Sequence, residues 1–240
     1  MENKLKGYIH SIETLGALDG PGIRTVVFMQ GCNLRCRYCH NPDTWNIANT
    51  PVLTVDELFD KIIRYKEYYG GDGGVTASGG EPLLQAEFLT ALFQKLKAAG
   101  INTALDTSGS VLNESVKGLL NYVDLVILDV KHTDSAAYEN LCGTRGILSA
   151  VMAFLEYCAG RKKRVWLRQV IIPGINDTKE QVLELKKLAD KYKPEKVELL
   201  PYHTMGVSKW EKLGLDYSLK DIPPADEKTV TCLYRSVFRA

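Results

Sequence analysis

Three of the six cysteines in this chain lie within eight residues, at Cys32, Cys36 and Cys39, in the spacing C-x3-C-x2-C. They follow an apolar segment, residues 25–29, that is typical of a buried strand. Three thiolates on one short loop can ligate three irons of a cubic [4Fe–4S] cluster, and no fourth cysteine lies nearby in the sequence. One iron would then be open to a small molecule. The spacing therefore predicts a cluster that takes part in a reaction.

Two other uses of these cysteines, a zinc site and a redox pair, stay open on spacing alone. A structural zinc ion requires four ligands, and His40, directly beside Cys39, is poorly placed to be the fourth. A disulfide framework is disfavoured because six cysteines in 240 residues are not a disulfide-dense composition. The remaining Cys142, Cys158 and Cys232 are scattered singly, and we interpret them as small buried hydrophobic residues.

Strands and helices are predicted to alternate along the chain and to position the cysteine loop. Helical segments begin with capping boxes at residues 54–57 and 178–181, and another, residues 87–99, ends at Gly100. The alternation predicts an α/β fold with a parallel sheet, either open or curled into a barrel. No linker or repeat is evident, so we expect one domain over residues 1–240. The predicted strands are residues 24–30, 74–78, 102–106, 125–130, 165–172 and 196–200.

Polar residues follow several of these strands at the point where each strand ends. In parallel barrels, chemistry gathers at the carboxyl ends of the strands, so we expect these residues to share one edge. About six strand–helix units fall short of the eight of a closed barrel. The strand-end segments are the cysteine loop after residue 30 and residues 79–81, 106–107, 129–131 and 201–203.

The spacing C-x3-C-x-aromatic-C resembles that of radical S-adenosylmethionine (SAM) enzymes. Several strings resemble one family among these, the activating enzymes of glycyl-radical enzymes, and within it the subgroup that acts on pyruvate formate-lyase. The resemblance runs almost from end to end of the chain, and it implies a partial (β/α)6 barrel that is open on one side. The matching strings are residues 19–24, 36–45, 76–82, 105–109, 128–131 and 199–203.

The resemblance implies an oxidoreductase with a [4Fe–4S] cluster on Cys32, Cys36 and Cys39 and with SAM as cosubstrate. Its expected reaction is reductive cleavage of SAM to a 5′-deoxyadenosyl radical, which takes a glycine Cα hydrogen from pyruvate formate-lyase under anaerobic conditions. The partners implied are pyruvate formate-lyase as protein substrate and a flavodoxin or ferredoxin as electron donor. We expect a monomer.

The resemblance also assigns residues to SAM. Tyr38 is expected against the adenine, and the Gly79–Gly80–Glu81 string near the amino group, where glycines allow close approach of the backbone. Arg168 is expected to reach the SAM carboxylate, since an inward Arg in a parallel strand is otherwise costly. The full expected set is Tyr38, Cys39, His40, Gly79, Gly80, Glu81, Asp129, Val130, Lys131, Arg168 and His203.

Two further sites are expected, one for a cation and one for contact with the protein substrate. Asp106 and Asp129 would bring negative charge close to the carboxylate of SAM, and a cation must compensate for it. Lys131 is one candidate, and a bound ion at Asp106, Thr107 and Asp129, for example a monovalent cation, is the other. Asp19 lies in a string that is a tight turn by pattern, and the resemblance assigns it to substrate contact.

Composition excludes several functions. The net charge of +1 gives no sign of a surface for nucleic acid, and no apolar run approaches the ~18 residues of a membrane span. The first residues lack the apolar core of a signal peptide, and cysteines that hold a cluster need a reducing compartment. We therefore expect a cytoplasmic protein.

Three alternatives remain at this level: an activating enzyme of another glycyl-radical enzyme, a radical SAM enzyme for a small molecule, and a zinc-stabilised binding module. Activating enzymes of other glycyl-radical enzymes often carry a cysteine-rich insertion after the cluster loop. Here the helix cap at Thr54 follows Trp45 by only nine positions, and the next cysteine is Cys142. The missing insertion favours the pyruvate formate-lyase subgroup.

Overall fold

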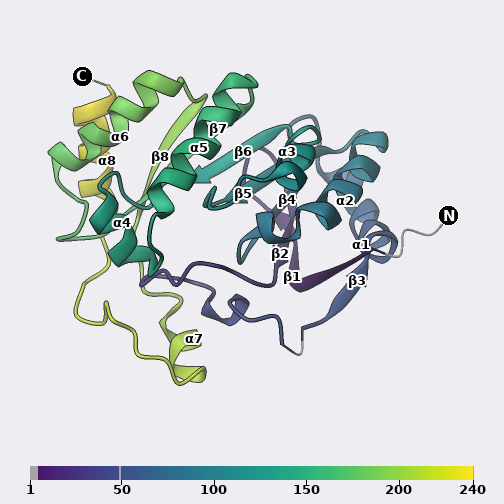
Figure 1. Ribbon diagram of the computed structural model, residues 1–240, viewed down its shortest axis with the longest axis horizontal. Helices are drawn as coiled ribbons and strands as arrows, with labels where there is room; N and C mark the ends of the chain where they lie inside the picture. The colour runs from purple at the N-terminus through teal and green to yellow at the C-terminus, as the bar shows by residue number, and fades with distance from the viewer. Residues whose placement is uncertain (1–4, 49, 240) are drawn as a thin grey trace. The chain divides into compact units, whose positions relative to one another are not determined.

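The computed structural model describes residues 5–48 and 50–239 (Figure 1). Its strands form one open sheet in the order β3-β1-β2-β4-β5-β6-β7-β8, which confirms the predicted α/β fold with an unclosed sheet. The pairs β2–β4, β4–β5 and β7–β8 are parallel, whereas β1 is antiparallel to both β2 and β3. The strands are β1 (Lys6–Gly16), β2 (Arg24–Met29), β3 (Val52–Thr54), β4 (Gly74–Gly79), β5 (Asn102–Thr107), β6 (Leu125–Asp129), β7 (Arg164–Ile171) and β8 (Lys196–Pro201).

All six predicted strands are confirmed, as β2 and β4 to β8, and two further strands, β1 and β3, were missed. Both lack the apolar run by which the others were found. In β1 only Gly7 and Ile9 are buried, and β3 is three residues long. These strands are held by antiparallel pairing at the sheet edge rather than by burial of both faces.

Both predicted capping boxes are present. The Thr54 hydroxyl accepts from the Glu57 amide while the Glu57 carboxylate accepts from the Thr54 amide, and Thr178 and Gln181 repeat the arrangement. Gly100 follows its helix with φ +74°, as predicted for a left-handed turn. The helices are α1 (Val55–Ile62), α2 (Ala86–Ala98), α3 (Glu114–Leu120), α4 (Ser135–Cys142), α5 (Ile147–Gly160), α6 (Lys179–Tyr192), α7 (Val207–Lys212) and α8 (Glu227–Phe238), with 3-10 turns η1 (Pro42–Thr44), η2 (Ile63–Tyr68) and η3 (Pro82–Gln85).

The contacts of the chain group it into two compact units, each built from two separate stretches. Unit 1 comprises residues 1–33 and 44–127, and unit 2 comprises residues 34–43 and 128–240. The division passes through the segment of residues 32–43, called the cysteine segment below. Cys32 belongs to unit 1, while Cys36 and Cys39 belong to unit 2. A single domain over the whole chain stays a prediction.

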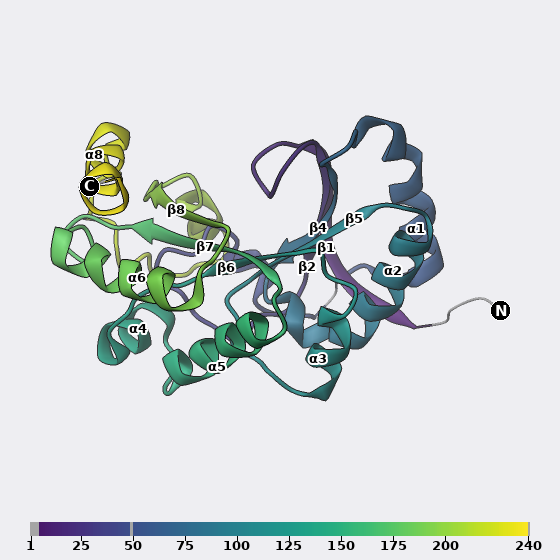
Figure 2. The same cartoon turned by 90° about the horizontal axis from the view of Figure 1, so that it is seen from above.

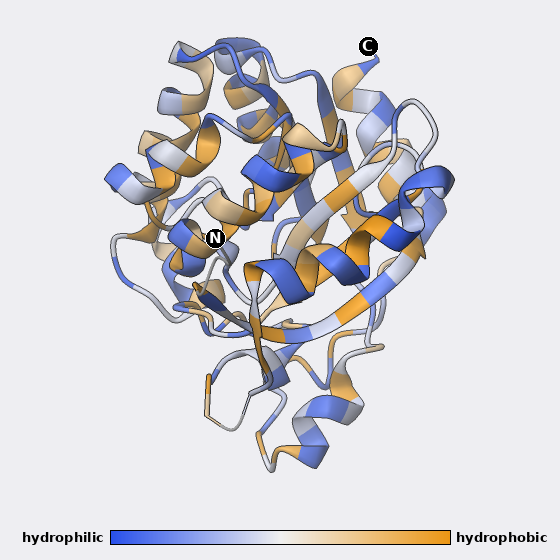
Figure 3. Ribbon diagram, turned by 90° about the vertical axis from the view of Figure 1, so that its right-hand side faces the viewer, coloured by the Kyte–Doolittle hydropathy of each residue, from blue (hydrophilic) through white to orange (hydrophobic). Residues whose placement is uncertain are grey.

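In unit 1 the helices pack with one apolar face against the sheet. Six residues of α2 are buried at helical spacing, and α2 lies beside α1 and α3. The hydropathy colouring shows blue and orange stretches alternating along the helices, as expected for helices with one apolar face (Figure 3). The buried residues of α2 are Ala86, Phe88, Leu89, Leu92, Phe93 and Leu96.

In unit 2, α6 and α8 cover part of the β7–β8 pair, and α8 runs beside α6 and β8 (Figure 2). Ile171, Val182, Val230 and Val237 form the buried cluster between these elements. In the part of the chain that the structure describes, no single helix is long and apolar enough to span a membrane. The α4–α5 pair passes that test only jointly, with a bend of 104°.

Candidate active site

In unit 1 the two glycines at the end of β4 are required by the protein's own backbone. A Cβ on Gly79 would lie 2.4 Å from the Met29 amide nitrogen, and Gly79 has φ +104°. A Cβ on Gly80 would lie 2.2 Å from the Gly31 carbonyl oxygen. The Gly80 and Glu81 amides donate to the Met29 and Gly31 carbonyls, at 2.9 and 2.8 Å. The two glycines thus let the ends of β4 and β2 approach closely, and their contact with SAM stays a prediction.

The Glu81 side chain is buried and fully engaged. Its carboxylate accepts from the Thr107 hydroxyl at 2.6 Å, from the amide and hydroxyl of Ser108 at 3.0 and 2.5 Å, and from the Leu83 amide at 3.1 Å. Burial raises the pKa of Glu81 above its ordinary value, against the lowering effect of these hydrogen bonds. Glu81 therefore caps η3 and ties the end of β4 to the end of β5.

The residues of the predicted cation site in unit 1 are also engaged by protein groups. Asp106 accepts from the Ser78 hydroxyl at 2.8 Å. The Thr107 hydroxyl donates to Glu81 and accepts from the Gly109 amide at 3.0 Å. A cation at Asp106, Thr107 and Asp129 stays a prediction.

Asp19 lies near the start of β2, at the opposite end of the unit 1 strands from Gly79, and its carbonyl accepts from the Thr76 hydroxyl at 2.7 Å. The fully buried Arg24 organises this turn through five hydrogen bonds, and burial lowers its pKa to about 10. The bonds run to the Thr76 hydroxyl, to the Pro21, Asp72 and Val75 carbonyls and to the Asn102 side chain. The 19–24 string therefore has a structural basis in Arg24, and substrate contact by Asp19 stays a prediction.

In unit 2 the cysteine segment is fixed to the C-terminal end of α4. The Arg35 amide donates to the Cys142 carbonyl at 2.8 Å, and the Arg37 amide donates to the Leu141 carbonyl at 2.9 Å. These are carbonyls of the last helical turn, which lack partners within a helix. Gly143 ends α4 with φ +65°, and a Cβ there would lie 3.2 Å from the Arg35 Cβ. The helix end thus serves as a platform for the segment.

Tyr38 is buried beside the Asp129–Lys131 ion pair. The Lys131 Nζ lies 5.5 Å from the centroid of the Tyr38 ring, and it pairs with Asp129 Oδ2. Burial lowers the pKa of Lys131, but the Asp129 carboxylate together with Tyr38 and Cys36 raises it well above its ordinary value. Lys131 therefore provides a fixed positive charge next to Tyr38.

His40 and His203 stack with their ring centroids 4.0 Å apart, which brings the end of the cysteine segment to the second residue after β8. Burial and the neighbouring His203 lower the pKa of His40 to about 4, so its ring is neutral at neutral pH. Gly206 allows this approach, because a Cβ on it would lie 2.7 Å from the His40 Cα.

Two residues of α7, neither predicted from the sequence, hold the cysteine segment in place. The Trp210 indole donates to the Cys39 carbonyl at 2.8 Å. Lys209 contacts Asn41 Oδ1 at 2.8 Å and Asp43 Oδ2 at 3.1 Å. Nothing in the local sequence marked them, because their partners lie about 170 positions away.

Arg168 is buried and pairs with Glu198, its register neighbour on β8, with Arg168 Nη2 and Nε at 3.0 and 3.1 Å from one carboxylate oxygen. The pair satisfies the expectation that a buried Arg in this strand needs a counter-ion, and Glu198 was not predicted. The neighbouring Val130 is buried, and its amide donates to the Arg168 carbonyl at 2.8 Å. Contacts of Arg168 and Val130 with SAM stay predictions.

Three buried polar atoms of predicted SAM residues in unit 2 have no hydrogen-bond partner among the protein groups that the structure describes. They are the Tyr38 hydroxyl, Asp129 Oδ1 and His203 Nδ1. Such atoms are costly unless a partner is supplied, and a ligand with amine, carboxylate and hydroxyl groups would supply one. The residues of unit 2 therefore fit a polar ligand of the kind expected from the sequence.

Within the described residues, no three His, Cys, Asp or Glu side chains converge on a single metal position. In a cubic cluster each thiolate binds a separate iron. None of the six cysteines, all in described positions, forms a disulfide, and Cys142 and Cys158 are buried as expected. The expectation for Cys232 was wrong, because it is exposed on α8.

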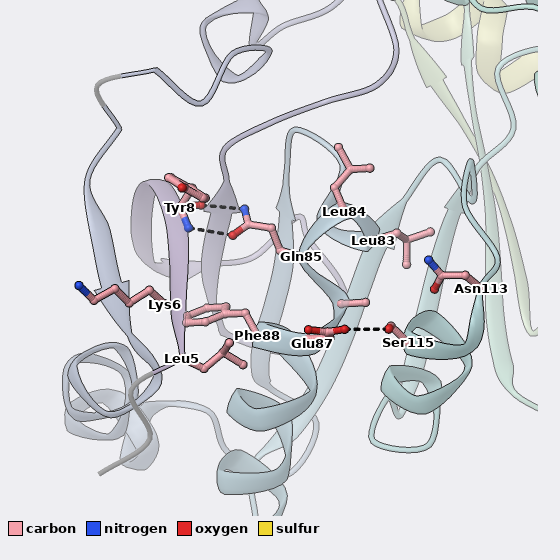
Figure 4. Close-up of a pocket in the computed structure, with 11 residues that line it drawn as sticks. Leu5, Lys6, Tyr8, Leu83, Leu84, Gln85, Glu87, Phe88, Asn113 and Ser115 are labelled. Carbon is pink, nitrogen blue, oxygen red and sulfur yellow. Dashed lines mark hydrogen bonds between the residues drawn. The ribbon is translucent and has the colours of Figure 1, made fainter.

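A separate hollow of about 360 Å³ lies in unit 1, between the start of β1 and the start of α2 (Figure 4). The Gln85 side chain bonds both backbone groups of Tyr8 there, and Ser115 donates to Glu87. No predicted site residue lines this hollow.

Residues 26–188 match the model of the radical SAM superfamily. The chain is 49% identical over 226 residues to the pyruvate formate-lyase-activating enzyme of Clostridium pasteurianum, covering 92% of this chain and 93% of the relative. It is 44% identical over 243 residues to the enzyme of that name from Staphylococcus epidermidis, covering 97% and 96%.

Among solved structures, Streptococcus suis SuiB bound to S-adenosylmethionine matches with a TM-score of 0.58 at 20% identity. The match covers 72% of this chain and 39% of that one. At this identity the likeness concerns the fold alone.

Proposed function

Since the chain belongs to the radical SAM superfamily, we propose that it activates pyruvate formate-lyase by removing the Cα hydrogen atom of one of its glycines. The observation that carries this proposal is the identity of 44–49%, over nearly the whole chain, to curated enzymes named for that activation. Enzymes of this superfamily use a [4Fe–4S] cluster and SAM, which together supply a 5′-deoxyadenosyl radical when bound.

The residues that would hold the cluster are Cys32, Cys36 and Cys39. Two of them are already positioned by neighbouring elements of unit 2. Cys36 lies between the two amides that bond the end of α4, and the Cys39 carbonyl is held by Trp210. Such outer contacts fix the ligands before the cluster binds.

The residues that would hold SAM in unit 2 are those with open polar atoms. Asp129 Oδ1 is free to accept from an ammonium group, because Lys131 occupies the other oxygen. The positive charge of Lys131 favours a carboxylate nearby. Tyr38 is only 4% exposed, so its ring excludes water from this position. The neutral His40 ring, stacked on His203, adds a donor and an acceptor without adding charge.

The substrate group is a glycine because its Cα hydrogens are not shielded by a side chain and its backbone bends readily. A flavodoxin or ferredoxin delivers the electron, and the activity belongs to a monomer in the cytoplasm under anaerobic conditions. A monovalent cation near Asp106, Thr107 and Asp129 completes the proposal.

The proposal is tested with protein reconstituted without oxygen, mixed with SAM, a reductant and pyruvate formate-lyase. Electron paramagnetic resonance should show a glycyl radical, and deuterium placed on the target Cα should appear in 5′-deoxyadenosine. The Cys36→Ala variant is the matched control and should produce neither signal. Cleavage of SAM with no deuterium transfer would show that the substrate is a different one.

The second candidate, activation of another glycyl-radical enzyme, is distinguished in the same assay. Offered both proteins at equal concentration, the enzyme should place the radical on pyruvate formate-lyase. A faster signal on the other protein would favour the second candidate.

A further inference from the structure

Cys142 lies against one of the proposed cluster ligands. Its Sγ is 3.9 Å from the Cys36 Sγ, and both side chains are buried, with exposures of 0% and 9%. Cys142 is the last residue of α4, and it is more than a hundred positions from Cys36 in the chain. The sequence suggested only a small buried residue here, so this contact is a product of the fold.

The contact is fixed by backbone groups on both sides. The Arg35 amide donates to the carbonyl of Cys142 itself, and the Arg37 amide donates to that of Leu141. These two bonds bracket Cys36, so its position relative to Cys142 does not depend on side-chain rotamers alone. The left-handed Gly143 directly follows Cys142 and stops the helix at this point.

A cluster ligand is a thiolate and carries no proton. Once Cys36 binds iron, only the Cys142 thiol can supply the hydrogen of this sulfur–sulfur contact. Hydrogen bonds to ligand sulfurs are among the factors that set the reduction potential of iron–sulfur clusters. They withdraw negative charge from the ligand, and this favours the reduced cluster, which carries one more electron.

We propose that Cys142 is a positioning residue whose thiol donates a hydrogen bond to the Cys36 thiolate and raises the reduction potential of the cluster. The inference rests on the proposed function only in that Cys36 holds a cluster. The step involves no bond to iron from Cys142 and no net transfer of its proton. Its consequence is a cluster that accepts an electron more readily from a protein donor.

The test compares wild type, Cys142→Ala and Cys142→Ser, each reconstituted without oxygen as the full chain. Cys158→Ala, which alters another buried thiol of unit 2, is the matched control. Redox titration followed by electron paramagnetic resonance should show a more negative midpoint for Cys142→Ala. At a fixed potential we expect about tenfold less reduced cluster, equivalent to 59 mV for one electron. Serine keeps a donor and should restore the wild-type midpoint.

A second readout is the iron–sulfur stretching region of the resonance Raman spectrum. Exchange into deuterium oxide should shift a wild-type mode, and this shift should be absent from Cys142→Ala. If Cys142→Ala fails to retain its cluster, Cys142→Val, which also lacks a donor, takes its place in both measurements.

Three results would overturn the proposal. They are an unchanged midpoint in Cys142→Ala at equal cluster content, a serine variant that shifts in the same direction as alanine, and no isotope shift in wild type. Failure of the proposed function is separate, since these measurements need no pyruvate formate-lyase. A shifted midpoint without any glycyl radical would retain this inference and reject only the substrate.

Discussion

The two units differ in how their predicted site residues are satisfied. In unit 1, Glu81 accepts four hydrogen bonds from protein groups, and Thr107 both donates and accepts. In unit 2, Tyr38, Asp129 and His203 each keep a buried polar atom without a partner in the described part of the protein. Residues from both units belong to strings that resemble one family. Protein groups satisfy the hydrogen bonds of the residues named in unit 1, but not all of those named in unit 2.

This difference in hydrogen bonding distinguishes residues that shape the site from residues whose open polar atoms we expect to bind a ligand. A saturated hydrogen-bond network holds strand ends in place whether or not anything is bound. An unpartnered buried atom costs free energy in the empty protein and returns it on binding. Mutations in unit 1 should therefore act on stability, and mutations in unit 2 should act on binding.

The largest expected effect concerns the cluster. Cys36→Ala should lose it completely, because a thiolate ligand is removed, while Cys158→Ala should keep full content. Iron and acid-labile sulfide analysis of protein purified without oxygen measures both. Stoichiometric zinc without acid-labile sulfide in the wild-type protein would show that it binds zinc and not an iron–sulfur cluster.

The next largest expected effect concerns the close backbone contact between Gly80 and Gly31 in unit 1. Gly80→Ala should lower the free energy of unfolding by about 3 kcal/mol, because the added Cβ would lie 2.2 Å from the Gly31 carbonyl oxygen. Gly118→Ala is the control, since a Cβ within α3 meets nothing within 4 Å. It should raise stability by about 0.5–1 kcal/mol. Equal effects in denaturant unfolding would contradict the packing explanation.

Thr107→Val tests the saturated network directly. It removes the donor to Glu81 and the acceptor for the Gly109 amide while keeping the side-chain shape. The free energy of unfolding should fall by about 1–3 kcal/mol. Thermal and denaturant unfolding check this, and a variant as stable as wild type would show that the network contributes little.

Tyr38→Phe tests the open region of unit 2. The hydroxyl has no protein partner, so its removal should change the stability of the ligand-free protein by less than about 0.5 kcal/mol. Calorimetry should nevertheless show SAM binding weakened by roughly fivefold, the equivalent of one hydrogen bond. If stability fell while SAM affinity held, the hydroxyl would be structural and the comparison would fail.

The smallest effect is the pH dependence that Glu81 gives to stability. Burial raises its pKa above the ordinary 4.5, so the folded protein retains this proton to higher pH than the unfolded chain. Its stabilising contribution is full below about pH 4.5 and is lost as the pH rises through the folded pKa. Glu81→Gln cannot ionise, and its unfolding free energy should lack this decline. If the unfolding free energies of wild type and Glu81→Gln changed in parallel with pH, Glu81 would not be the source of the pH dependence.

Local sequence patterns located the six core strands, through their apolar runs, and both capping boxes, through their residue spacing. These patterns missed β1 and β3, whose residues are held by antiparallel partners rather than by burial. The interpretation of Gly79 and Gly80 as space for a ligand was incomplete, since their Cβ positions are taken by backbone near the end of β2. A glycine shows that something approaches closely, but the sequence does not show what.

The sequence by itself determined the chemistry of this protein. Cysteine spacing favours a cluster, and ordered strings indicate a family, because a ligand set and its flanking turns are encoded within a few residues. Only the tertiary structure decided which polar atoms are satisfied and which remain open. It also set Cys142 against Cys36, and Trp210 and Lys209 against the cysteine segment. These contacts join residues more than a hundred positions apart, and their distances follow from the packing of helices and strands rather than from any local pattern.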